Sequence, residues 1–102
     1  MSYFITTTMR EAKRMDTLRK SYEKQLAGMP KGSLRLKERN NKNYYYLSYR
    51  RDGKVVSDYV GTDESAIIEL KEQLERRRGI ENLLKGIRKE LALMNKVLEA
   101  AK

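Results

Sequence analysis

The stretch Asn41–Gly61, NKNYYYLSYRRDGKVVSDYVG, decides the fold of this chain of 102 residues. Its Asp52-Gly53 step separates two segments with the two-residue alternation of β-strands. Asp-Gly is typical of a two-residue hairpin turn, because a type I′ turn needs positive φ at both central residues. A turn at these residues predicts three cross-strand pairs: Tyr49 with Val56, Leu47 with Asp58, and Tyr45 with Val60.

A second hairpin is expected just before the first, with its turn at Asn40-Asn41. This hairpin pairs Leu36 with Tyr45 and Leu34 with Leu47. Both hairpins place the same residues of the middle strand on the same face. The sequence therefore predicts a three-stranded antiparallel meander over residues 33–61.

A helix is predicted before the sheet, over residues 9–27. Thr8-Met-Arg-Glu11 has the form of a capping box, in which a hydroxyl and a carboxylate bind free backbone N–H groups at a helix start. Gly28 and Pro30 end the helix. Its apolar residues recur at steps of three and four and form one stripe: Met9, Ala12, Met15, Leu18, Tyr22 and Leu26.

Two further helices, over residues 63–78 and 80–101, are predicted after the sheet. They should meet at a bend near Gly79, because the apolar stripe shifts phase there. The second helix has apolar residues at heptad a and d positions: Ile80, Leu84, Ile87, Leu91, Met94 and Leu98. This seam either packs within the chain or joins two copies as a homodimer. We expect one small α+β domain over residues 1–102, with element order α-β-β-β-α-α.

The composition favours a partner that carries negative charge. The formal net charge is +9, and residues 31–61 alone carry eight basic and three acidic side chains. Cysteine and histidine are both absent, which excludes disulfides and thiolate chemistry. No metal-ligand spacing, catalytic constellation or phosphate-binding glycine loop occurs, so we expect no enzyme activity, cofactor or metal. No segment is apolar enough to span a bilayer, so a soluble cytoplasmic protein is expected, without membrane contact.

Alternation divides the sheet residues between two faces. Seven apolar or aromatic residues share one face and need a helix over it: Leu34, Leu36, Tyr45, Leu47, Tyr49, Val56 and Val60. Asp58 also falls on this face, although a charged residue is not expected at a core position. Tyrosines and basic residues share the other face, which is either an ordinary solvated surface or a nucleic-acid platform.

The functional reading selects a set of candidate residues. With the hairpin tip, the residues expected to bind nucleic acid or a partner are Arg35, Lys37, Tyr44, Tyr46, Arg50, Arg51, Lys54 and Tyr59. A secondary basic cluster is formed by Arg76, Arg77 and Arg78, for which a solvated helix face is the alternative.

Two resemblances add to this picture. The run GSLRLKERNNKNYYYLSYRRDGKVVSDYVGTDESAIIELKEQL, residues 32–74, resembles the three-stranded arm-type DNA-binding domain of phage integrases. The whole chain, with its PKGSL, YYYLSYR, DGK and YVG segments, resembles small type II-A anti-CRISPR proteins from mobile elements of Gram-positive bacteria. Neither resemblance carries functional residues over to this chain.

The second resemblance implies an inhibitor of an RNA-guided nuclease in a bacterial host cell. A protein with a net charge of +9 cannot mimic DNA. It would instead bind the guide RNA, or an acidic surface of the nuclease, and interfere with their assembly. The alternative is a DNA-binding regulator of a mobile element, and a third possibility is a coiled-coil adaptor.

Overall fold

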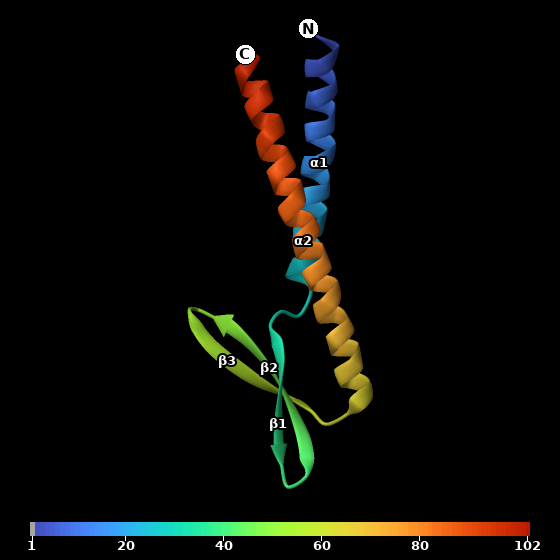
Figure 1. Ribbon diagram of the computed structural model, residues 1–102, viewed down its shortest axis with the longest axis vertical. Coiled ribbons are helices and arrows are strands. Elements are labelled where there is room, and N and C mark those ends of the chain that lie inside the picture. The colour runs from blue at the N-terminus through green and yellow to red at the C-terminus, as the bar shows by residue number, and fades with distance from the viewer. Residues whose placement is uncertain (1) are drawn as a thin grey trace. The chain divides into compact units, whose positions relative to one another are not determined.

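A computed structural model describes residues 2–102 and has an α+β fold, as predicted. The elements follow in the order α1 (Tyr3–Ala27), β1 (Ser33–Arg39), β2 (Lys42–Arg51), β3 (Lys54–Gly61) and α2 (Glu64–Ala100) (Figure 1). The chain forms two compact units. One is a helix pair made of α1 and Gly79–Lys102, and the other, Met29–Arg78, contains the sheet and the first turns of α2.

The sheet is an antiparallel meander with strand order β1-β2-β3. Both connecting turns have two residues with positive φ, 52° and 63° at Asn40-Asn41 and 52° and 79° at Asp52-Gly53. This is the geometry that the turn residues predict. Four of the five predicted cross-strand pairs are confirmed: Leu34 with Leu47, Leu36 with Tyr45, Leu47 with Asp58, and Tyr49 with Val56.

The fifth predicted pair, Tyr45 with Val60, is wrong. Tyr46 lies opposite Tyr59, but Tyr45 lies opposite Gly61, so β3 contains one extra residue at this point. Such a β-bulge leaves its extra residue without a cross-strand partner and bends the strand. Gly61, with φ of 124°, adopts backbone geometry that other residues rarely reach.

The predicted start of the first helix is also wrong, by about two turns. The Ser2 hydroxyl accepts a hydrogen bond from the Ile5 backbone N–H at 3.0 Å, so Ser2 is the N-cap of α1. Thr8 lies inside the helix, where its hydroxyl donates to the Phe4 carbonyl at 2.8 Å. The capping-box pattern that begins at Thr8 therefore lies inside the helix, because Ser2 already caps the helix N-terminus.

After the sheet, one helix replaces the two that were predicted. The Asp63 carboxylate accepts a hydrogen bond from the Ser65 N–H at 3.1 Å, and α2 then continues for 37 residues through Gly79. An interior glycine costs only about 1 kcal/mol relative to alanine. Helical residues on both sides of Gly79 keep the backbone hydrogen bonds in place, and this cost does not interrupt the helix.

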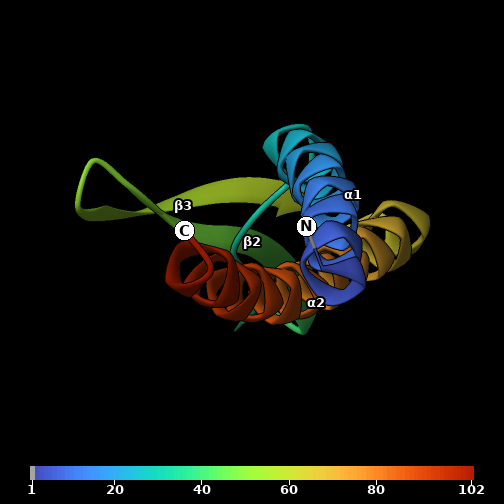
Figure 2. The same cartoon turned by 90° about the horizontal axis from the view of Figure 1, so that it is seen from above.

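The heptad seam of α2 packs within the helix pair. Ile80, Leu84 and Leu91 are buried, as is Ala12 of α1, and Leu84 is only 2% exposed. The two helices lie side by side (Figures 1 and 2) and are antiparallel, since Glu23 of α1 contacts Arg88 while Ile5 lies near Leu98. Ile80, Leu84 and Leu91 are thus intramolecular core and are not available to join two copies, while the other seam residues, Ile87, Met94 and Leu98, are half-buried.

A charged contact joins the two helices at Glu23. Its carboxylate accepts hydrogen bonds from Arg88 of α2 at 3.1 Å and from Arg19 of α1 at 3.0 Å. The hydrogen bond from Arg88, followed by the one from Arg19, lowers the pKa of Glu23 below its ordinary value. Arg19 also donates to Asp16 at 3.0 Å and lowers the pKa of that carboxyl.

These lowered pKa values make the helix pair sensitive to acid. A carboxyl with a lowered folded-state pKa stabilises the fold above its unfolded-state pKa, and this contribution is lost as pH falls through the folded-state value. We expect this contribution to be present at neutral pH and to be lost as pH falls below about 5. Glu23→Gln should be less stable at neutral pH and lose less on acidification, measured by urea unfolding followed by circular dichroism. Glu69→Gln, at an exposed position of α2, is the control. If the free energy of unfolding of Glu23→Gln depends on pH as strongly as that of the natural protein, the proposed role of Glu23 is contradicted.

Gly32 is required where the chain enters β1. Its φ is 121°, and a β-carbon added there would lie 2.3 Å from the Ser48 carbonyl oxygen on β2. No side chain fits without moving the β2 backbone. Gly28, four residues earlier, has an ordinary φ of −94°, and its nearest neighbour to an added β-carbon is at 3.8 Å.

We therefore expect Gly32→Ala to lower the free energy of unfolding by roughly 2 kcal/mol, from the strained φ and the clash together. Gly28→Ala is the matched control and should change stability by less than about 1 kcal/mol. Urea titration of both variants measures the difference. Equal stabilities would show that the Gly32 backbone relaxes freely.

Candidate nucleic-acid interface

The two faces of the sheet differ in charge. The register places twelve residues on one face, here called the basic face: Ser33, Arg35, Lys37, Arg39, Lys42, Tyr44, Tyr46, Ser48, Arg50, Val55, Ser57 and Tyr59. Every ionised side chain among them is an arginine or a lysine. The acidic residues within the strands, Glu38 and Asp58, are both on the opposite face. One face of the sheet therefore carries positive charge alone, and both acidic residues of the strands lie on the other face.

Three tyrosines form a cluster in the middle of the basic face. The Tyr59 ring lies between Tyr46, at 5.4 Å between centroids, and Tyr44, at 6.3 Å, with tilted planes in both pairs. The Lys37 ammonium lies 4.9 Å from the centroid of the Tyr46 ring, a cation–π distance. Tyr59 is 58% exposed although it touches both neighbours. The cluster thus stabilises the β2–β3 pairing and still presents aromatic surface to solvent.

Basic side chains surround these tyrosines. Arg39 lies opposite Lys42 at one end of the face, Arg50 lies opposite Val55 at the other end, and Arg35 lies opposite Tyr46 on β1. Within residues 2–102 none of these four basic groups forms an ion pair. Uncompensated positive charge at both ends of an aromatic patch can bind phosphates, with the rings left for bases or sugars.

The structure brings together six of the eight predicted site residues. The other two, Arg51 and Lys54, lie opposite each other on the far face, in phase with Tyr49 and Val56. The prediction grouped the hairpin tip as one cluster, although strand alternation continues to the last paired residues. The same alternation, applied to the β1–β2 hairpin, places Arg39 and Lys42 on the basic face. The prediction did not include these two residues.

The first turns of α2 lie against the opposite face. Ile67 is only 3% exposed, and one turn later the Lys71 ammonium lies 5.8 Å from the Tyr45 ring centroid. Asp58 has a partner on this face, because the Tyr49 hydroxyl donates to its carboxylate at 2.6 Å. This hydrogen bond raises the pKa of Tyr49. Asp58 is thus a hydrogen-bonded and solvent-exposed residue beside the apolar ones.

The secondary basic cluster does not act as a unit. Arg77 is half-buried and donates a hydrogen bond to the Met29 carbonyl oxygen at 3.1 Å, which ties α2 to the segment before β1. Arg76 and Arg78 are exposed. The structure therefore gives Arg77 a structural contact and leaves its two neighbours on the solvent side of α2.

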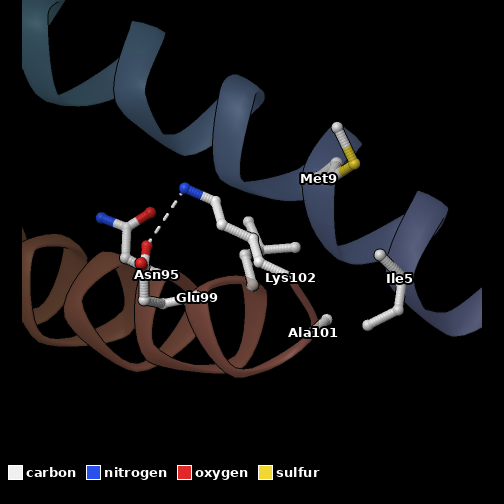
Figure 3. A pocket seen from close by; sticks show the side chains of 7 residues that line it. Ile5, Met9, Asn95, Glu99, Ala101 and Lys102 are labelled. Carbon is white, nitrogen blue, oxygen red and sulfur yellow. Dashed lines mark ion pairs between the residues drawn. The ribbon is translucent and has the colours of Figure 1, made fainter.

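The helix pair offers grooves, but they are mainly apolar. One, of ≈ 480 Å³, lies where the start of α1 meets the end of α2 and is lined by Ile5, Met9 and Leu98 (Figure 3). The nearby Glu99 carboxylate pairs with the Lys102 ammonium at 3.3 Å (Figure 3). Among residues 2–102 there is no cluster of metal-ligating side chains, and neither helix is long and apolar enough to cross a bilayer. The basic face is the best candidate for a functional site.

Comparisons with known proteins identify a family and no function. Residues 10–70 match the family described as a domain of unknown function, DUF6788. The matched segment contains most of α1, the whole sheet with its basic face, and the first turns of α2. No curated protein and no solved structure matches the chain. Since the match covers more than half of its residues, the chain belongs to the DUF6788 family.

Proposed function

We propose that this protein is a non-enzymatic nucleic-acid-binding protein and that the basic face of its sheet is the binding surface. The observation that carries the proposal is the separation of charge across the sheet. Five basic residues and three tyrosines share one face without any acidic residue, while both strand acids lie on the other. A charged surface selected only for solubility would gain from mixing the two signs.

The geometry suits a partner with regularly spaced phosphates. From Lys42 to Arg50 along β2 the face extends for about 26 Å at about 3.3 Å per residue. Three strands at about 4.8 Å spacing give a width close to the roughly 12 Å of the B-DNA major groove. Basic groups at both ends would contact phosphates, while Ser48, Ser57 and the tyrosine cluster would face bases or sugars between them.

The sheet offers matched variants for a test of this surface. Arg39→Ala/Lys42→Ala and Arg51→Ala/Lys54→Ala each remove a cross-strand pair of basic residues beside a two-residue turn, on opposite faces. We expect the first double variant to weaken binding about tenfold or more and to reduce the slope of log affinity against log salt by about 2. The affinity of the second double variant should stay within about twofold of that of the natural protein, because its two lost charges lie on the face that does not bind. Both variants lose the same net charge, so the comparison isolates the effect of the face. Fluorescence anisotropy with labelled RNA and DNA measures both, and equal losses would contradict the assignment to one face.

We propose two narrower roles, which differ in the nucleic acid. The resemblance to type II-A anti-CRISPR proteins favours interference with guide RNA–nuclease assembly, and exposed tyrosines beside basic groups suit unpaired RNA bases. The resemblance to integrase arm-type domains favours a regulator that binds duplex DNA of a mobile element. The second role is supported by basic groups at both ends of a face about as wide as a major groove.

Tyrosine substitutions distinguish the two roles. If the rings stack on unpaired bases, Tyr46→Ser and Tyr59→Ser should each weaken RNA binding by about 1–3 kcal/mol, while Tyr→Phe at the same positions keeps most of the affinity. If the partner is duplex DNA, the phosphate contacts dominate and these substitutions should matter much less. Circular dichroism of each variant controls for loss of the hairpin.

A loading assay tests the inhibitor role directly. Nuclease and guide RNA are mixed with and without an excess of this protein, and their complex is followed by gel shift. Less complex with the natural protein, and normal loading with the Arg39→Ala/Lys42→Ala variant, supports interference with assembly. Unchanged loading at excess protein contradicts it, even if the protein binds RNA.

A further inference from the structure

A second stripe, apolar except for one glutamate, runs along α2 beside the buried heptad seam. Six of its members each directly precede a seam residue, and Ala100 continues the same spacing of alternating steps of four and three. The stripe consists of Gly79, Leu83, Gly86, Glu90, Leu93, Val97 and Ala100. Leu83 is 55% exposed, Leu93 59% and Val97 37%. Residues at this spacing share one side of a helix. We propose that this stripe is the contact surface of a homodimer in which two antiparallel helix pairs pack as a four-helix bundle.

The surface is shaped for another helix. Gly79 and Gly86 are two turns apart, and a β-carbon added at either would meet no atom within 4 Å. They leave two notches in the stripe, and Leu83, Ile87 and Met15 of α1 line the groove around them. Glycines at a helix surface let another helix approach closely and give its larger side chains room to enter. Met15 shows that α1 contributes to the same side of the helix pair.

Charge determines the orientation of the second copy. Glu90 lies in the middle of the stripe and Lys89 beside it, and within residues 2–102 neither forms an ion pair. A parallel dimer would place the two Glu90 carboxylates together in an apolar contact, which is unfavourable. An antiparallel dimer with its two-fold axis between Lys89 and Glu90 gathers two carboxylates and two ammonium groups around the axis.

The same orientation matches large residues to small ones. With the axis between Lys89 and Glu90, Leu93 faces Gly86 of the partner subunit and Gly79 faces Ala100 of the partner subunit. Leu83 then lies close to Val97 of the partner subunit. Because the axis is two-fold, each contact occurs twice, as in any isologous interface. The stripe is therefore complementary to itself in both shape and charge.

The surface is large enough for a stable dimer. From Gly79 to Ala100 the helix rises about 32 Å, and two adjacent helices are about 20 Å wide. The face of one helix pair thus has a projected area of about 640 Å², and the accessible area it buries is larger. Standard protein interfaces bury about 800 Å² on each partner. Two helices alone also have a small core, which a second pair would enlarge.

Sedimentation equilibrium of the full chain without nucleic acid tests the proposal. We expect a dimer whose dissociation constant rises at least tenfold in Gly86→Leu, since the larger side chain fills the notch. Leucine is a better helix former than glycine and the notch is open in the single chain, so circular dichroism should show retained helix. Ala92→Leu is the matched control. Ala92 lines the groove on the Asp16 and Arg19 side of α2, so this variant should remain dimeric.

Charge exchange provides a second test that does not depend on glycine. Lys89→Glu and Glu90→Lys should each weaken the dimer, and the double variant Lys89→Glu/Glu90→Lys should restore it, because it recreates two carboxylates and two ammonium groups at the axis. A natural protein that stays monomeric up to about 100 µM overturns the proposal. A dimer that is insensitive to Gly86→Leu, or that the double charge exchange fails to restore, also overturns it. Binding of nucleic acid does not enter the measurement, so either proposal can fail alone.

Discussion

The alternation of side chains along β2 is the constraint on which the rest of the sheet depends. Two turns of only two residues, each with positive φ at both positions, hold β1 and β3 in register against it. Because a strand has a period of two residues, a slip of one residue would exchange the faces. Tyr46 would then point toward α2 and Tyr45 away from it. Short turns thus determine which side chains face the helix and which form the basic face.

Charge is arranged differently in the two units. In the helix pair, the acidic residues of α1 are bound by arginines: Glu11 by Arg14, Asp16 by Arg19, and Glu23 by both Arg19 and Arg88. On the basic face of the sheet no carboxylate is close in the register to offset the arginines and lysines. Every carboxylate of α1 therefore has a basic partner, although the helix keeps three more basic than acidic residues, whereas the basic face of the sheet has no carboxylate at all. A polyanion would gain most from contact with the sheet.

Local chemistry made the sheet predictable from the sequence, and the same chemistry explains the errors. Asn40-Asn41 and Asp52-Gly53 define two turns, and period-two alternation then assigns nearly every strand residue to its face. The bulge at Val60 has no such signature, because an inserted residue changes the phase without changing the residue types. Sequence proximity at the hairpin tip groups Arg51 and Lys54 with Arg50, whereas strand alternation places them on the far face. The phase shift at Gly79 predicts a break between two helices, although tertiary packing and continuous hydrogen bonding override a single glycine.

The helix pair is built from the two ends of the chain, with the sheet unit inserted between them. The segment that matches the DUF6788 family, residues 10–70, includes most of α1 but none of the residues of α2 that cover it. A fragment trimmed to that segment would keep the basic face and leave the apolar side of α1 in water. Such a fragment would be prone to aggregate and to bind unrelated surfaces. Biochemical work on this family member is therefore better done with the intact chain than with the excised family segment.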